Sequence, residues 1–396
     1  MQNEDRVQST SPFQSPDAEI REVPLEAFPG IRIGQAEDAA GGTGITVVLS
    51  EDPAGMAAGL HIGGGGPATR ETGILDPVTT AQRVHAAVLG GGSAFGLDAA
   101  GGVMRYLEEK GIGVEVRGVR VPLVTQVDLF DLPVGDPHVR PDQAMGYAAC
   151  KAAEQGVRGN YKSGCRGAGC GATIGKYAGI EHAMKSGIGA CVLRHGDLLV
   201  GAVIAVNAFG DIYDWKSGQK IAGAHTPDGR LYDRMEMVSF MRALEGARVQ
   251  NGRMKQAEDG AFNTTIGIVF TNAPFRKAEL CKIAAMAHDG FARSIAPVHT
   301  SGDGDSVIAL SVCSRPAPEE GAVSLESDSL APAGADGSSG TLSTAEKTLP
   351  AAEKTCVQAG IDSVGILAAM AASEAILRGV RSAESAYGLT ALADLR

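Results

Sequence analysis

The sequence predicts an α+β fold in which sheets and helices form separate layers. Apolar side chains make up 44% of the 396 residues and charged ones 20%, so the chain can bury a large core. Short apolar runs outnumber the helical patterns and do not alternate with them as in a βαβ chain. A layered arrangement is therefore favoured over a Rossmann-type parallel sheet.

The elements follow from apolar spacing and from the turn signals between the apolar segments. Short apolar runs bounded by turn residues predict strands at 43–49, 57–62, 84–89, 264–271 and 306–312. Apolar residues at helical spacing predict helices at 94–110, 142–154, 274–293 and 361–377. Two further runs, 187–193 and 198–206, flank His195-Gly196-Asp197 and predict a hairpin.

One folded domain, residues 28–313 plus 354–396, is expected. Residues 1–27 form a polar segment that we predict to be a disordered tail, and no signal peptide is visible in it. Residues 314–353 are rich in Pro, Ser, Ala, Gly and Glu, which predicts a disordered insertion. No run reaches 18 consecutive apolar residues, so a membrane span is not expected.

Composition also argues against several classes of partner. The net charge of −11 and an aromatic content of 5% speak against nucleic-acid binding. The seven cysteines are odd in number and scattered, which suits reduced thiols in a cytoplasmic protein better than a disulfide framework. The close pair Cys165 and Cys170 has no second pair or histidines at zinc-site spacing, so no metal is expected.

The glycine-rich segments do not fit nucleotide-binding loops. In the segment 90–96 the dinucleotide pattern fails, because Phe95 or Ser93 stands where a glycine is required. Gly175-Lys176 imitates the end of a P-loop, but Tyr177 replaces the required Ser or Thr. No organic cofactor is expected, and the glycines are interpreted as sites of tight turns and close packing.

The most informative segment is Asn263-Thr264-Thr265, which opens an apolar strand. If the chain is cut before Thr264, that residue carries both a hydroxyl and a free α-amine. An α-amine has a pKa of about 8, suited to a general base, and an N-terminal threonine activated by its own amine is a known nucleophile. The alternatives are an ordinary strand start and a glycosylation acceptor.

Several blocks together resemble one family, the L-aminopeptidase/D-esterase type of self-cleaving N-terminal nucleophile hydrolases. This family includes β-peptidyl aminopeptidases and nylon-oligomer hydrolases. The resembling blocks run in family order at 63–67, 69–72, 91–100, 145–150, 169–176, 206–211, 263–265 and 301–306. The resemblance implies a four-layer α/β/β/α sandwich, cut between Asn263 and Thr264 into chains 1–263 and 264–396, and a tetramer of cut protomers.

The resemblance also implies the roles of the site residues. Thr264 is the nucleophile for self-cleavage and for turnover, and Asn207 donates to the oxyanion that both steps develop. Asp303 and Asp305 orient the amine of Thr264. Without the resemblance, Asn207 reads as a turn residue and Asp303-Gly304-Asp305 as a solvated turn.

Lys176 and Tyr147 are implied to complete the pocket and its proton network. Read without the resemblance, they are a surface lysine and a half-buried helix tyrosine. Histidine takes no part in this predicted mechanism: His288 and Asp289 are adjacent in a helix and point apart, so a structural or solvent-facing role is expected for His288. Trp215 is interpreted as a core residue, with a substrate groove as the alternative.

The predicted function is an aminopeptidase acting on short peptides, amino-acid amides or esters. The alternative is an endo-type amidase for non-standard oligomeric amides, because Asp-x-Asp with a threonine resembles the nylon-oligomer hydrolases more than the Ser-x-Glu of the serine-type aminopeptidases. The related ornithine acetyltransferase type ranks third, since its Ala-Thr-Met-Leu segment is missing. An uncut, non-catalytic paralogue is the remaining alternative.

Overall fold

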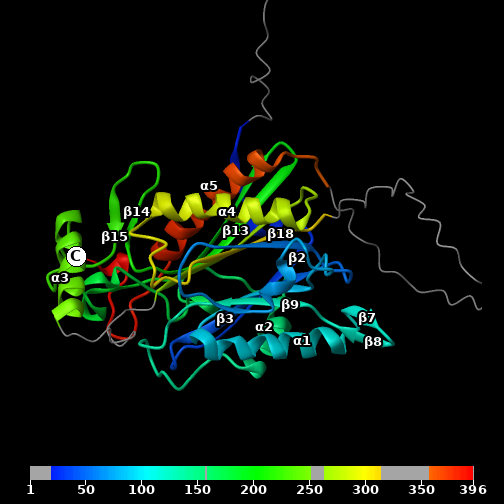
Figure 1. Cartoon of the computed structure of the whole chain (residues 1–396), viewed down its shortest axis with the longest axis horizontal. Coiled ribbons are helices and arrows are strands. Elements are labelled where there is room, and N and C mark those ends of the chain that lie inside the picture. The colour runs from blue at the N-terminus through cyan, green and yellow to red at the C-terminus, as the bar shows by residue number, and fades with distance from the viewer. Residues whose placement is uncertain (1–18, 157, 251–262, 314–355, 396) are drawn as a thin grey trace, which may run out of the picture.

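Four layers of secondary structure make up the computed structural model, which describes residues 19–156, 158–250, 263–313 and 356–395 (Figure 1). Two pairs of helices form the outer layers: α4 (Lys277–Ser294) with α5 (Ile361–Arg381), and α1 (Ala99–Glu109) with α2 (Gln143–Ala153). Two sheets lie face to face between these pairs. The predicted α/β/β/α sandwich is confirmed.

The sheet under α4 and α5 has six strands in the order β1-β12-β13-β16-β18-β4. Their bounds are β1 Arg21–Val23, β12 Ile188–His195, β13 Leu198–Asn207, β16 Thr264–Thr271, β18 Ser306–Ser311 and β4 Ala57–Ile62. Neighbours are antiparallel except β16 and β18, which are parallel because α4 returns the chain between them. The starts of these two strands therefore lie at the same end of the sheet.

The second sheet has five strands in the order β2-β3-β6-β9-β5. Their bounds are β2 Ile31–Asp38, β3 Thr43–Ser50, β6 Ala86–Gly90, β9 Val124–Asp128 and β5 Ala68–Arg70. Here β6 and β9 are the parallel pair, and α1 lies in the connection between them. Each sheet thus contains one parallel pair whose crossover helix covers its outer face.

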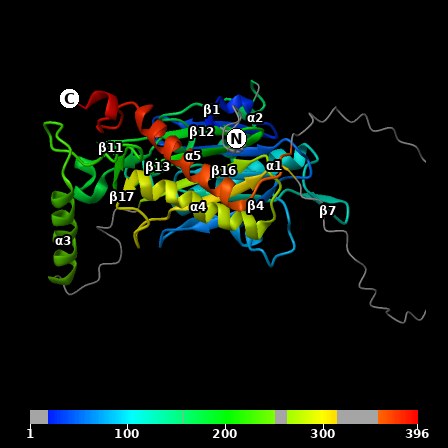
Figure 2. The same cartoon turned by 90° about the horizontal axis from the view of Figure 1, so that it is seen from above.

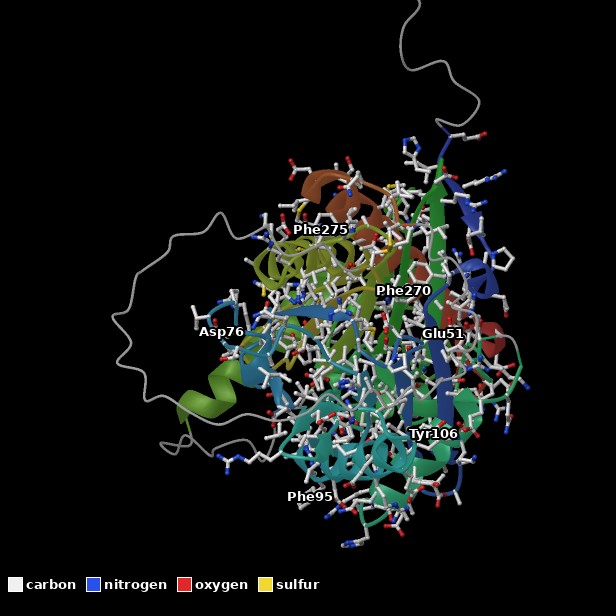
Figure 3. All side chains as sticks on the ribbon, turned by 90° about the vertical axis from the view of Figure 1, so that its right-hand side faces the viewer. Glu51, Asp76, Phe95, Tyr106, Phe270 and Phe275 are labelled. Carbon is white, nitrogen blue, oxygen red and sulfur yellow. A yellow bond between two sulfur atoms is a disulfide. The ribbon has the colours of Figure 1, made fainter. Side chains whose placement is uncertain are left out.

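Alternating side chains of both sheets meet in the middle of the sandwich. Phe270 of β16 packs edge-on against Phe28, with ring centroids 4.6 Å apart, and both are buried. Figure 3 shows Phe270 between Phe275, near the α4 layer, and Tyr106 in the α1 layer. The core between the sheets is therefore separate from the two cores beneath the helices.

Glycines bring the layers close together. A Cβ added at Gly189 of β12 would lie 2.1 Å from the Ala375 carbonyl oxygen of α5, and one at Gly59 of β4 would lie 2.4 Å from the main-chain nitrogen of Cys281. In the segment 90–96, a Cβ at Gly91 would lie 2.1 Å from Oδ2 of Asp131. These close approaches agree with the packing interpretation of the glycines.

A smaller layer extends from one end of the sandwich. It contains the sheet β15-β14-β17 and the helix α3 (Arg234–Gln250), which projects away from the body at the end opposite the β7–β8 hairpin (Figure 2). The bounds of its strands are β14 Asp211–Tyr213, β15 Lys220–Ala222 and β17 Ile295–Ala296. Two separate two-stranded sheets are formed by β7 Val114–Val116 with β8 Val119–Val121, and by β10 Thr173–Ile174 with β11 Met184–Lys185. Because β14 follows β13 directly, this layer lies next to the carboxyl end of β13.

Most of the predicted elements are confirmed, apart from small shifts at their ends and the following differences. The helix expected from residue 94 begins at Ala99, because residues 93–98 form a 3-10 turn after the left-handed Gly92 and Ser93. Within the predicted tail 1–27, Arg21–Val23 instead pairs with β12 as an edge strand, and residues 1–18 lie outside the described part of the chain. The sequence reasoning also missed β2, β9 and α3. The insertion at 314–353 lies outside the described residues.

The expectation that all cysteines are reduced is wrong. Cys313 and Cys356 form a disulfide, with the Cα atoms 5.7 Å apart and a sequence separation of 43 residues. Sequence spacing could not show this pair, because β18 ends just before Cys313 and the chain returns at Cys356 to start α5. The other five cysteines are free thiols. The argument from reduced thiols therefore no longer supports the cytoplasmic expectation, which stays a prediction.

Helix α5 is long and apolar enough to cross a membrane by length and composition, but 72% of that apolar window is buried inside the structure. It packs against α4 on one side and against the strands β12 and β13 on another. The described residues therefore use α5 as a core helix.

Candidate active site

Three strand ends meet at the end of the six-stranded sheet where β14 begins. Thr264, the first residue of β16, stands opposite Asn207, the last residue of β13. Along β16 the side chains of Ile266 and Ile268 enter the core between the sheets, so strand alternation places Thr264 on the same face. The predicted nucleophile and Asn207 therefore lie together, and both are buried.

The peptide bond between Asn263 and Thr264 lies beside the hydroxyl of Thr264. Oγ1 of Thr264 donates to the Asn263 carbonyl oxygen at 2.6 Å, and the main-chain N–H of Gly304 donates to the same oxygen at 2.8 Å. A Cβ at Gly304 would come within 2.7 Å of Oγ1 of Thr264. Glycine at 304 thus lets a backbone donor reach the carbonyl without displacing the hydroxyl.

Asp305 links the loop before β18 to the backbone beside Thr264. Its Oδ1 accepts from the main-chain N–H of Thr265 at 2.7 Å. Its Oδ2 accepts from the main-chain N–H of His299 at 3.0 Å and lies 2.8 Å from the Nδ1 of His299. Asp305 is therefore near Thr264, as predicted, and its partners fix the plane of the carboxylate.

Asp303 lies on the other side of Gly304. Its Oδ2 accepts from the main-chain N–H of Thr300 at 2.7 Å, and Oδ1 is buried without a hydrogen-bond partner among the described residues. Burial and the nearby charge of Asp305 raise the pKa of Asp303 to about 6. A carboxyl in this state can exchange a proton near neutral pH.

Lys176 reaches the same place from the segment after β10. Its Nζ donates to Oδ1 of Asn207 at 2.8 Å and to the carbonyl oxygen of Asn207 at 3.1 Å. Burial lowers the pKa of Lys176 to about 7, against the opposing influence of Asp303, Asp131 and Asp305. A partly neutral amine beside Asn207 can accept or hold a proton at neutral pH.

Asn207 is held rigidly by its own contacts. Its Oδ1 accepts from the main-chain N–H of Thr173 at 3.0 Å as well as from Lys176, and its Nδ2 donates to the carbonyl oxygen of Phe130 at 2.8 Å. The oxyanion role of Asn207 stays a prediction, because in this uncut chain the Asn263 carbonyl oxygen accepts from Gly304.

The prediction that Tyr147 lines the pocket is wrong. Its hydroxyl donates to Glu109 at 2.7 Å, and Arg105 lies over its ring, on the outer surface of the α1 and α2 layer. The block 145–150 supplies Gly146, Ala149 and Cys150 to the buried face of α2. Its resemblance to the family therefore concerns packing here.

The sequence reasoning missed His299, Gly304 and Asp131. His299 contacts Asp305, whereas the predicted mechanism names no histidine. Asp131 is buried, accepts from Thr43 at 2.8 Å, and helps to keep Lys176 protonated. Gly304 lies inside the block 301–306 and His299 lies just before it, and this position was the available signal for both.

Two further interpretations are confirmed. His288 is buried in α4, and its ring packs against Phe291 with centroids 5.1 Å apart, as expected for a structural residue. Trp215 packs against the core beneath α5 and donates to Glu374 at 3.1 Å.

Among the described residues, no cluster of three or more His, Cys, Asp or Glu side chains could hold a metal ion.

The four-layer sandwich defines a protein of the fold found in N-terminal nucleophile hydrolases. A solved structure with this fold is the L-aminopeptidase D-Ala-esterase/amidase of Ochrobactrum anthropi, with a TM-score of 0.56, 16% identity, and coverage of 91% of this chain and 86% of that one. At this identity the likeness shows the fold alone.

The sequence model of peptidase family S58 matches residues 26–392, and the chain belongs to this family. An uncharacterised aminopeptidase of Mycobacterium tuberculosis (strain ATCC 25618 / H37Rv) is 35% identical over 375 residues, 92% of this chain and 96% of that protein. A 6-aminohexanoate-oligomer endohydrolase of Agromyces sp. (strain KY5R) is 32% identical over 290 residues, 73% and 75% of the two chains. The chain is thus similar to peptidases and to an amide hydrolase.

Proposed function

We propose that this chain cleaves itself between Asn263 and Thr264 and then hydrolyses amide bonds with Thr264 as an N-terminal nucleophile. The observation that carries the proposal is the pair of hydrogen bonds to the Asn263 carbonyl oxygen, from Oγ1 of Thr264 and from Gly304. A carbonyl held between a hydroxyl and a fixed N–H donor is arranged for attack by that hydroxyl.

The self-cleavage step moves an acyl group from nitrogen to oxygen. Oγ1 of Thr264 attacks the carbonyl carbon of Asn263, and the Gly304 N–H stabilises the resulting oxyanion. The bond to the Thr264 nitrogen then breaks, and that nitrogen takes up the proton that the hydroxyl loses. Water hydrolyses the ester, which leaves a carboxylate on Asn263 and a free α-amine and hydroxyl on Thr264.

Turnover repeats this chemistry on a substrate amide. The free amine of Thr264 acts as the base for its own hydroxyl, in the manner of N-terminal threonine nucleophiles. Asp303 and Lys176 supply this end of β16 with groups that can hold protons near neutral pH, and Asp305 binds the main-chain N–H of Thr265. An acyl-enzyme forms, the amine product leaves, and water releases the acid.

The substrate class we propose first is the amino-terminal residue of short peptides, amino-acid amides and esters. The family S58 match and the mycobacterial relatives that are named aminopeptidases support this choice. Endo-cleavage of oligomeric amides is the second candidate. It is favoured by the Asp303-Gly304-Asp305 segment and by the relative named as an oligomer endohydrolase.

Hydrolysis assays on two substrates test the proposal. The wild type is expected to release aniline from an L-alanine anilide, and Thr264→Ala is expected to lose at least about a thousandfold in rate. Thr264→Ser, which keeps a hydroxyl, serves as the matched control and is expected to retain cleavage. A wild type that hydrolyses neither this substrate nor a 6-aminohexanoate oligomer contradicts the proposal.

The oligomer also separates the two substrate classes. Acetylation of its amino end blocks an aminopeptidase, which needs a free terminal amine, but leaves internal bonds open to an endo-type amidase. Unchanged hydrolysis of the acetylated oligomer therefore selects the endo reading, and its loss selects the aminopeptidase.

A further inference from the structure

His299 joins the loop after β17 to the carboxylate beside the nucleophile. Its ring Nδ1 lies 2.8 Å from Oδ2 of Asp305, and its main-chain N–H donates to the same oxygen at 3.0 Å. The other oxygen of Asp305 accepts from Thr265, the residue after Thr264. The Asp305 carboxylate thus connects His299 to the first residues of β16.

The backbone of His299 is held in a costly conformation. Its φ is 56°, in the left-handed region that residues other than glycine adopt rarely, although histidine does so more often than most. Such a conformation persists where the surroundings overdetermine it. Here both the ring and the main-chain N–H of His299 are directed at one buried oxygen of Asp305, which supplies that constraint.

The groups around His299 favour a positive charge on it. Burial lowers the pKa of His299, but its hydrogen bond to Asp305 and the charges of Asp305 and Asp303 outweigh this, so the pKa is raised above the ordinary 6.5. On the other side stands His288 of α4, with the ring centroids 4.6 Å apart. Burial lowers the pKa of His288 to about 4, so it is neutral.

His61 of β4 completes the row of rings. Its centroid lies 5.0 Å from that of His288, and burial lowers its pKa, as do the charges of His299 and Lys282. Among these three histidines, His299 alone has a raised pKa. Its cation therefore stands opposite the two carboxylates of Asp303 and Asp305.

We propose that His299 is a positioning residue of the site, which pairs with Asp305, orients that carboxylate against Thr265 and so holds Thr264 for acyl transfer. The inference rests on the proposed hydrolase function and deepens it. Two nearby carboxylates disfavour each other's ionisation, and a cation beside one of them offsets that effect. Without the cation, Asp305 loses its charged partner and the orientation that this partner fixes.

His299→Asn is the informative variant. Asparagine can place a neutral N–H donor near the position of Nδ1 and tolerates the left-handed conformation, but it carries no charge. His195→Asn is the matched control, because His195 ends β12 at the hairpin turn, at the opposite end of the sheet from Asn207. Activity of each is measured on the alanine anilide as a function of pH.

The sign of the pH dependence follows from the raised pKa of His299. The contribution of its charge is complete below the ordinary value of 6.5 and is lost as pH rises through the raised value. At pH 6 we expect His299→Asn to lower kcat by about tenfold with little change in KM, because a charged hydrogen bond is replaced by a neutral one. The deficit is expected to shrink toward pH 9, and His195→Asn should match the wild type throughout.

A ratio of wild-type to His299→Asn activity that does not change with pH overturns the inference, since a purely structural role predicts a constant loss. An inactive wild type instead contradicts the proposed function, so the two failures are distinct.

Nuclear magnetic resonance titration of the histidines in the uncut Thr264→Ala chain gives a second measurement that does not depend on activity or on the folding of His299→Asn. One imidazole should remain protonated above pH 6.5, and Asp305→Asn should lower its pKa. The absence of such an imidazole in this titration also overturns the inference.

Discussion

At the scale of single residues, the site depends on backbone N–H groups as much as on side chains. The main-chain N–H groups of Gly304, Thr265 and Thr300 bind the Asn263 carbonyl, Asp305 and Asp303 respectively. Backbone donors of this kind are fixed by the fold and need no reorganisation during a reaction. A glycine lies between the two aspartates because a Cβ there would come within 2.7 Å of Oγ1 of Thr264.

Gly304→Ala is predicted to block self-cleavage. The added Cβ lies within 2.7 Å of Oγ1 of Thr264 and 2.8 Å of the Gly66 carbonyl oxygen, so the hydroxyl must move from its position beside the Asn263 carbonyl. Gly302→Ala is the control, since no atom lies within 4 Å of a Cβ there. Denaturing electrophoresis over time measures the fraction cut, and equal cutting of the two variants contradicts the prediction.

Much of the site was predictable from short blocks of sequence. Thr264, Asn207, Asp303, Asp305 and Lys176 were named from their blocks, and the structure brings all five together. Tyr147 was misplaced because a block does not show which face of its helix is buried. His299 was missed because its contact with Asp305 depends on a left-handed backbone conformation that sequence does not reveal.

At the scale of elements, the central strands were predictable and the peripheral ones were not. β13 and β16 are continuous buried runs, whose apolar pattern is strong. β1 has three largely exposed residues and forms only through pairing with β12, and no helix was expected at the position of α3. Tertiary contacts decide such segments, which is why local pattern failed there.

The disulfide between the end of β18 and the start of α5 is predicted to stabilise the fold. Cross-linking residues 43 apart reduces the entropy of the unfolded chain, and Cys313→Ser is expected to lower the free energy of unfolding by about 2–4 kcal/mol. Denaturant unfolding with and without reductant measures this, with Cys281→Ser, a free thiol, as control. A wild type that is insensitive to reductant and equal to Cys313→Ser contradicts the prediction.

At the scale of the whole molecule, the two pieces of the proposed cut are interleaved. The second piece contains β16, α4, β18 and α5 (Figure 1). The first piece contains β13, which pairs with β16, and β4, which pairs with β18. Separating the pieces would break the β13–β16 and β18–β4 pairings of the six-stranded sheet and expose the core between α5 and β12. The cut chains are therefore expected to stay together, and their assembly into a tetramer stays a prediction.

Intact-mass analysis of the purified protein beside Thr264→Ala tests the central claim most directly. The account predicts two wild-type chains of 263 and 133 residues (396 − 263), with Thr264 as the new amino terminus, and a single uncut chain for the variant. A wild type that remains one chain after long incubation lacks the free amine on which the mechanism depends. That result would contradict the account and favour a non-catalytic paralogue with the same fold.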